Sequence, residues 1–196
     1  MSSKKQAIIL GNGESRKGFD YRKEYPNAFV IGCNGAYKEK PDALVCVDNY
    51  MQHIIYSTGY CRENTCYFSE WSPMPVEVAR QIGESLGNPI VENTNTLYNN
   101  FAQVAGSEKF TYITWTHRKD LVISIPEVKV SSGSRALMIA CELGYEEIIL
   151  CGFDGMGATN IYQNDRGYER STPREEWIQE RQNIMNKYKN IEFKII

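Results

Sequence analysis

The sequence predicts an α/β fold of the Rossmann-like type, with a mostly parallel sheet and helices on both faces. Short apolar runs in the chain are continuous rather than alternating, which is typical of strands buried on both faces. Segments with helical spacing lie between these runs, and strands that alternate with helices form parallel sheets through right-handed crossovers. The 196 residues contain no repeat and no linker, so we expect a single domain over residues 1–196.

Six runs have the pattern of buried strands. They are 7–10, 28–33, 43–47, 66–69, 110–115 and 147–152. A seventh run, "IEFKII" at 191–196, alternates apolar and polar residues, which suits an edge strand. Residues 72–100, rich in Pro, Asn and Thr, predict a helix followed by a long loop over the sheet.

Two segments give the clearest helix signals. In "SRALMIACELGY" (134–145) apolar residues recur on one face, and Gly144 can end the helix in a left-handed turn. The second segment, 172–189, has Thr172 as its expected N-cap and Pro173 at its first position.

Composition excludes several classes of protein. The formal net charge is −2, which gives no general electrostatic attraction to nucleic acid or to an anionic membrane. No apolar run reaches the roughly 18–20 residues of a membrane span, and the polar start "MSSKKQ" lacks the apolar core of a secretory signal. We therefore expect a cytoplasmic protein.

The six cysteines predict buried thiols rather than disulfides or zinc ligands. Cys33, Cys46 and Cys151 fall in the strand-like runs, where a thiol behaves as a small apolar side chain. The closest pair, Cys61 and Cys66, has no second Cys or His pair at metal-binding spacing. We expect no metal site of this kind.

Small and polar residues gather where the predicted strands end. The five segments are Gly11-Asn12-Gly13-Glu14-Ser15, Cys33-Asn34-Gly35, Asp48-Asn49, Ser131-Ser132-Gly133-Ser134 and Gly152-Phe153-Asp154-Gly155. Ligands of open α/β sheets bind beyond the carboxyl ends of the strands. Since parallel strands bring these ends to one edge, the convergence predicts a binding site there.

Each segment has two interpretations when taken alone. The glycines of Gly-Asn-Gly suit a phosphate-binding turn before a helix or an ordinary tight turn, and neither GxGxxG nor GxxxxGK[ST] is present. The serines at 131 and 132 suit a helix N-cap or a phosphate site. Asn34 suits a turn. Asp48 suits a structural role, a ribose contact or a Mg²⁺ ligand.

The segments, taken in order, resemble the bacterial sialyltransferases that have one Rossmann-like domain and use CMP-sialic acid, together with the wider superfamily around them. "IILGNGESRKGFDY" resembles the family's first strand and its Gly-Asn-Gly-Pro-Ser-Leu turn, and "VIGCNGAY" its second strand with Arg-Cys-Asn. "VSSGSRALMIACELGYEEIILCGFD" is similar to its Thr-Ser-Gly helix and Gly-Ile-Asp strand end. "YQNDRGY" supplies two tyrosines at the family's six-residue spacing.

The resemblance implies roles for particular residues. The residues expected to contact the nucleotide donor are Gly11, Asn12, Gly13, Ser15, Asn34, Asp48, Ser131, Ser132 and Gly133. Tyr162 and Tyr168 would donate hydrogen bonds to the departing phosphate. Asp154 and His117 are the candidate bases for the acceptor hydroxyl, because this chain has no histidine after His117, where the family's base would follow the second tyrosine.

Two further departures bear on the donor. Glu14-Ser15 stands where the family has Pro-Ser, and Asp48 stands near the position of a family asparagine. A carboxylate beside a phosphate requires a cation or a basic side chain nearby. The candidate basic side chains are Arg16, Arg135, Arg166 and Arg170.

The leading hypothesis is therefore a glycosyltransferase that uses a CMP- or UDP-type sugar and no required cofactor. The acceptor hydroxyl would belong to a glycan or to a hydroxymethylated nucleic-acid base, as in phage-type enzymes. Two alternatives stay open. One is a pyrophosphokinase-like enzyme with Mg²⁺ on Asp48 and Asp154. The other is a non-catalytic nucleotide-binding module.

Overall fold

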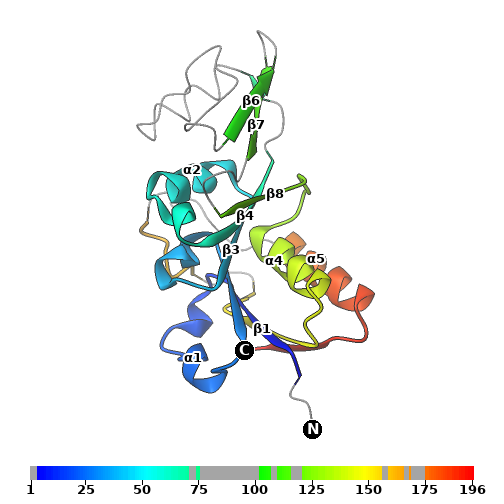
Figure 1. The fold of residues 1–196 in the computed structure, drawn as a ribbon. Helices are drawn as coiled ribbons and strands as arrows, with labels where there is room; N and C mark the ends of the chain where they lie inside the picture. The colour runs from blue at the N-terminus through cyan, green and yellow to red at the C-terminus, as the bar shows by residue number, and fades with distance from the viewer. Residues whose placement is uncertain are drawn as a thin grey trace. The chain divides into compact units, whose positions relative to one another are not determined.

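The computed structural model describes residues 4–70, 74–75, 102–106, 110–115, 121–155, 159–165, 168 and 175–196. Its main feature is a seven-stranded sheet with helices, shown in Figure 1. The strand order is β10 (Glu192–Ile195), β9 (Glu147–Cys151), β1 (Gln6–Leu10), β2 (Phe29–Cys33), β3 (Ala43–Cys46), β4 (Thr65–Ser69) and β8 (Val122–Ile125). The pairings β10–β9, β9–β1, β1–β2, β2–β3 and β4–β8 are all parallel. The predicted Rossmann-like α/β class is confirmed.

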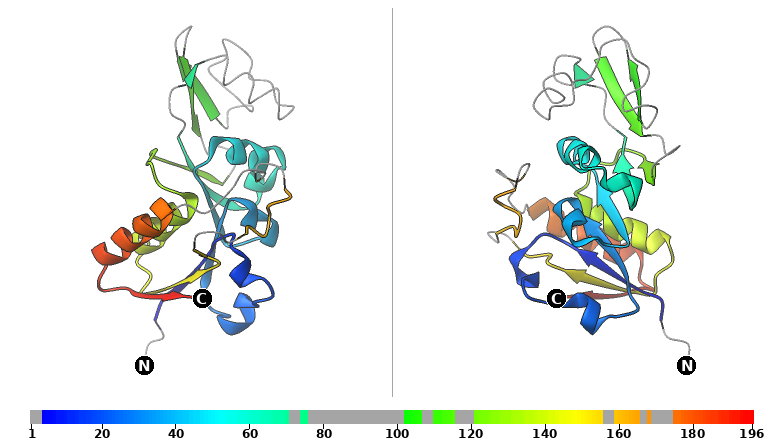
Figure 2. Two further views of the ribbon diagram at one scale, coloured as in Figure 1. Left: turned by 180° about the vertical axis from the view of Figure 1, so that it is seen from behind. Right: turned by 60° about the vertical axis from the view of Figure 1, so that its left-hand side comes forward.

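The chain packs as two compact units, residues 1–45 with 130–196 and residues 46–129. In the first unit, β1 and β9 are apolar and buried after their first residues, Gln6 and Glu147, as their continuous apolar runs predicted. Helices α4 (Ser132–Glu142) and α5 (Glu175–Lys187) lie on one side of these strands. The 3₁₀ segments η1 (Glu14–Arg16) and η2 (Asn34–Glu39) and helix α1 (Tyr21–Glu24) lie on the other side (Figure 2).

The second unit contains a helix and a separate small sheet. Helix α2 (Asn49–Ser57) follows β3, and the 3₁₀ segment η3 (Tyr60–Arg62) leads into β4. Strands β5 (Met74–Pro75), β7 (Phe110–Trp115) and β6 (Ala102–Gly106) form an antiparallel sheet in that order. Residues 110–115 are therefore a strand, but their predicted place in the parallel sheet is wrong.

Other element predictions hold to within a few residues. Helix α4 starts at Ser132, within the Ser131–Ser134 segment expected to lead into it, and Gly144 after it has φ of 73°, as expected for a left-handed helix end. Strand β10 lies at the edge of the sheet, in agreement with its alternating pattern. Strand β8 and helix α2 were not predicted. The Thr172 cap, its Pro173 neighbour, and the helix and loop expected at 72–100 lie outside the described residues, apart from strand β5.

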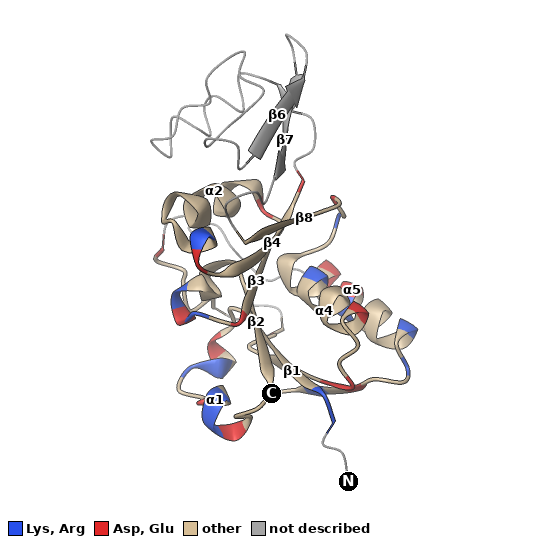
Figure 3. Cartoon of the chain, viewed as in Figure 1, with Lys and Arg blue, Asp and Glu red and all other residues tan. Residues whose placement is uncertain are grey.

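The six cysteines are buried free thiols, as predicted. Within the described residues no helix has the length and apolar character that a bilayer span needs. Basic and acidic residues stand side by side on α1 and α5 rather than in blocks of one sign (Figure 3). Both helices therefore present mixed charge to the solvent.

Gly11 is the glycine on which the packing of the first unit depends most directly. A Cβ at this position would lie far inside contact distance of the main-chain carbonyl of Gly152, so that the loops after β1 and β9 would have to separate. Gly11→Ala should lower the free energy of unfolding by about 1–3 kcal/mol, because backbone atoms cannot move aside as a side chain can.

The matched control is Gly155→Ala, where a Cβ would meet nothing within 4 Å and the backbone does not require glycine. Urea unfolding followed by circular dichroism measures both variants, and the control should stay within about 0.5 kcal/mol of the native chain. Equal stability of the two alanine variants would contradict the close approach of the β1 and β9 loops at Gly11.

Candidate functional site

The carboxyl edge of the sheet in the first unit brings together loops from distant parts of the sequence. The Oγ of Ser132, at the start of α4, donates to Oδ1 of Asn34, at the end of β2, over 2.9 Å. Gly133 packs against the loop after β9, since a Cβ there would lie 2.7 Å from the ring of Phe153. The Ser-Ser-Gly segment therefore lies beside both the β2 and the β9 loops, as the convergence of strand ends predicted.

A hydroxyl group joins the first two loops. The hydroxyl oxygen of Tyr168 accepts from the main-chain N–H of Gly35 at 2.6 Å and from Nδ2 of Asn12 at 2.9 Å. Asn34, between these groups, has φ of 49°, a left-handed conformation that asparagine tolerates better than most residues. The other amide atom of Asn12, Oδ1, is buried and has no hydrogen-bond partner in the described part of the chain. Such an acceptor is costly unless something donates to it.

The Gly-Asn-Gly turn is a packing device in this structure. The N–H groups of its two glycines donate to protein oxygens, Gly11 to Cys151 and Gly13 to Gly152, and that of the next residue, Glu14, donates to Thr159. These main-chain donors are therefore already used. The glycines serve the close approach of the β1 and β9 loops, which is the second of the two interpretations that the sequence allowed for them.

Asp154 holds this turn in place. Its carboxylate accepts from both the main-chain N–H and the hydroxyl of Ser15, and a Cβ on Gly13 would overlap the carboxyl group. The carboxylate retains lone pairs beyond those that Ser15 uses, because an ionised carboxyl has about four acceptor sites. Asp154 thus lies beside the Gly-Asn-Gly turn, at the sheet edge where the sequence predicted it. Its hydrogen bonds from Ser15 were not predicted.

Arg16 makes the most extensive side-chain network of the site. It is 6% exposed, its Nε donates to the carbonyl of Gly11 at 2.6 Å, and its two terminal nitrogens donate to both oxygens of Glu39 at 2.8 and 2.6 Å. The hydroxyl of Tyr162 donates to Glu39 and also accepts from Arg16 at 3.0 Å. The cluster Arg16–Glu39–Tyr162 therefore ties the loops after β1, β2 and β9 together.

The charges in this cluster stabilise one another. Burial would raise the pKa of Glu39, but hydrogen bonds from Arg16 and Tyr162 outweigh burial and hold that pKa below its usual value of 4.5. Burial, followed by the bond to Glu39, raises the pKa of the Tyr162 hydroxyl. At neutral pH Tyr162 is therefore a protonated donor whose hydrogen is directed at Glu39.

The start of α4 offers donors of a different kind. Ser131 caps the helix by accepting from the N–H of Ser134, and its own N–H and Oγ donate to Glu180 of α5. The N–H of Gly133, in the first turn, donates to no described residue, as expected for an amide that precedes the first helical hydrogen bond.

One turn further on, Arg135 is 8% exposed and its Nε is buried without a partner. No carboxylate in the described ranges pairs with this guanidinium. A cation this deep is costly unless an anion compensates it. Arg135 and Arg16 were both candidates to offset negative charge, but Arg16 is already fully engaged by Glu39.

The remaining predicted site residues belong to the second unit or lie outside the described residues. Asp48 belongs to the second unit, where its carboxylate accepts from the N–H of Met51 and caps α2. His117, Arg166 and Arg170 lie outside the described residues. Within the described part of the chain, no three Asp, Glu, His or Cys side chains gather as metal ligands would.

Comparisons of the chain with protein-family models, curated proteins and solved structures found no match. Two carboxylates that organise it, Glu39 and Glu180, were not predicted. Neither stands in a motif, and each acts on a residue more than 20 positions away in the sequence.

The pKa of Glu39 predicts a pH-dependent contribution to stability. Its pKa in the folded chain lies below that in the unfolded chain, so its stabilising effect is complete above the usual value of about 4.5 and is lost as the pH falls through the folded-state value. Urea midpoints measured from about pH 7 to about pH 3 should fall more steeply for the native chain than for Glu39→Gln.

The difference between the two curves isolates Glu39 from other acids such as Glu147, whose pKa is also lowered, first by its hydrogen bond from Lys194. Parallel curves would show that the Arg16–Glu39 pair does not couple to folding.

Proposed function

We propose that the chain is a glycosyltransferase that takes its sugar from a CMP- or UDP-type donor bound at the carboxyl edge of the first unit. The observation that carries the proposal is the buried guanidinium of Arg135 without an anionic partner in the described ranges. Ser132 and Arg135 are three residues apart on α4 and so share a face, and helical side chains lean towards the N-terminus of their helix. A phosphate at the start of α4 would compensate this charge.

The residues around Arg135 supply the other contacts of a nucleotide. The N–H of Gly133 and the positive end of the α4 dipole favour the phosphate. The buried Oδ1 of Asn12 offers an acceptor to a donor on the base or ribose. Asn34 accepts a hydrogen bond from Ser132, and the next residue, Gly35, donates to the hydroxyl of Tyr168.

Sugar transfer needs stabilisation of the leaving phosphate and removal of a proton from the acceptor. The first task falls to Arg135, Gly133 and the hydroxyl of Tyr168, which accepts hydrogen bonds from Asn12 and Gly35. Tyr162 is a positioning residue, since its hydroxyl is directed at Glu39. Asp154 is the candidate base, oriented by Ser15. In this proposal the products are the glycosylated acceptor, the nucleotide and a proton.

Arg135→Met tests the phosphate contact. It should weaken binding of CMP or UMP about 10- to 100-fold, the loss of a charge-assisted hydrogen bond, while leaving the stability of the free chain unchanged or higher, because a costly buried cation is removed. Isothermal calorimetry and thermal unfolding measure the two effects.

The matched control is Arg62→Met at an exposed position of η3 in the second unit. A loss of stability in Arg135→Met with unchanged nucleotide binding would make Arg135 structural and contradict the proposal. Stabilisation of the native chain by ATP and Mg²⁺ alone, abolished by EDTA, would favour the pyrophosphokinase-like alternative instead.

Tyr168→Phe tests the leaving-group contact. With a donor that supports turnover, kcat should fall by about 100-fold, the usual cost of removing one donor to a developing oxyanion, with a smaller change in KM. Tyr25→Phe, whose ring packs on the core beside α1, is the control and should keep full activity. Equal turnover of the two variants would remove Tyr168 from the mechanism.

A further inference from the structure

A polar cavity lies beside the Arg16–Glu39 pair, which forms part of its lining. It has a volume of about 380 Å³, at the lower end of the range for small-ligand sites. Its walls come from η1 and the turn after it, from the start of α1, from the end of η2 and from the turn at 160–164. Every one of these elements belongs to the first unit.

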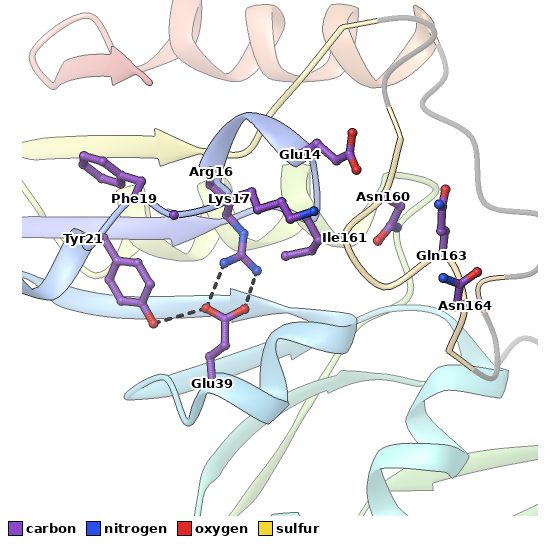
Figure 4. Close-up of a pocket in the computed structure, with 11 residues that line it drawn as sticks. Glu14, Arg16, Lys17, Phe19, Tyr21, Glu39, Asn160, Ile161, Gln163 and Asn164 are labelled. Atoms are coloured by element: carbon purple, nitrogen blue, oxygen red, sulfur yellow. Dashed lines mark hydrogen bonds and ion pairs between the residues drawn. The ribbon is translucent and has the colours of Figure 1, made fainter.

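Figure 4 shows two kinds of wall at its two ends. The rings of Phe19 and Tyr21 stand at one end, and the amide side chains of Asn160, Gln163 and Asn164 stand at the other. The rings are fixed, because both pack against the buried core of β1, β2 and β9. The cavity therefore combines an aromatic face with a row of amides.

The polar groups of this cavity are largely uncommitted. The side chains of Gln163 and Asn164 form no hydrogen bond with any described residue, and neither do those of Glu14 and Lys17. Asn160 uses only its carbonyl oxygen, which accepts from the N–H of Tyr162, so its amide hydrogens remain available. Donors and acceptors are thus present in about equal measure.

The charges of the lining cancel. Arg16 is neutralised by Glu39 through two hydrogen bonds, and the lining holds one further residue of each sign, Lys17 and Glu14. A phosphate would meet no excess positive charge here, and a metal ion would meet no cluster of carboxylates among the lining residues. A neutral ligand with many hydroxyl groups and an apolar face matches this wall best, and a hexose has both.

The cavity also adjoins the nucleotide side of the site. The N–H of Ile161, which lines it, donates to the carbonyl of Asn12 at 2.9 Å, and Asn160 bridges to Gly13. Tyr162 contacts Glu39 with its hydroxyl and Gly35 with its ring. One turn of chain thus has the cavity on one side and the Gly-Asn-Gly loop on the other.

We propose that this cavity binds the acceptor as a neutral hexose unit of a glycan, with the sugar face on Phe19 and Tyr21 and its hydroxyls on Gln163, Asn164 and Asn160. That the bound sugar is the acceptor rests on the proposed function. The binding of a neutral sugar rests only on the lining of the cavity. Mixed charge on the neighbouring α1 agrees with a neutral glycan rather than with nucleic acid.

The test is saturation-transfer NMR on the full chain with a panel of neutral hexoses, N-acetylhexosamines and their disaccharides. At least one should bind, and the double variant Gln163→Ala/Asn164→Ala should raise its Kd about 5- to 10-fold for each amide lost. The matched control is Gln179→Ala/Asn183→Ala, which removes the same two side-chain types from the exposed face of α5. The control should bind the sugar as the native chain does.

The proposal is overturned if no neutral sugar of the panel gives a signal, or if both double variants bind it alike. It is also overturned if a nucleoside or inorganic phosphate displaces the sugar and Lys17→Gln abolishes that competition, because the cavity would then be an anion site. CMP and UMP binding, measured in parallel with Arg135→Met, tests the donor side separately. If the sugar does not bind, the nucleotide measurement still tests the donor site, and if the nucleotide does not bind, the sugar measurement still tests the cavity.

Discussion

The hydrogen bonds of one buried guanidinium hold the candidate site together. Arg16 reaches from η1 to the carbonyl of Gly11, to Glu39 after β2, and to Tyr162 beyond β9, so a single side chain fixes three strand-end loops. The constraint extends to Gly152, where φ is 75° and a Cβ would lie 2.7 Å from Cδ of Arg16. Only glycine satisfies both conditions. Because the Arg16 cation is buried, loss of Glu39 would leave its charge uncompensated. Glu39 therefore has a structural role.

The same cluster separates two chemically different regions. On the side of Asn34 and α4, three groups have no partner among the described residues. They are the guanidinium Nε of Arg135, the N–H of Gly133 and the Oδ1 of Asn12. On the other side, around Lys17 and Gln163, the lining is neutral and rich in uncommitted hydrogen-bonding groups. Since Tyr162 touches both Glu39 and Gly35, its side chain connects the two regions. Rigid positioning of this kind is what a reaction between two bound substrates needs.

Local sequence patterns correctly predicted those strands and helix ends that depend mainly on neighbouring residues. The strands β1, β2 and β9 follow from continuous apolar runs, and the end of α4 follows from Gly144. What the sequence did not predict depends on tertiary partners. Strand β8, with only four residues and an exposed Ile123, has too short a pattern to distinguish from a loop. Residues 110–115 have the apolar run of a parallel strand, but their partners β5 and β6 place them in an antiparallel sheet. Glu39 gave no signal, because the identity of its partner Arg16 appears only after β1 and β2 have paired.

The Gly-Asn-Gly segment has the composition of a phosphate-binding turn but a different role in this structure. Glycines after a buried strand are typical of phosphate-binding turns, and here they have the backbone freedom that such a turn needs. Yet the amides of Gly11 and Gly13 donate to the β9 loop, and the carboxylate of Asp154 occupies the space above Gly13. A carboxylate in that space would repel a phosphate. Under the proposed function, the phosphate therefore binds on α4, where the charge of Arg135 is opposite to that of Glu180 on Ser131, and Gly13 leaves the room that the carboxylate of Asp154 needs.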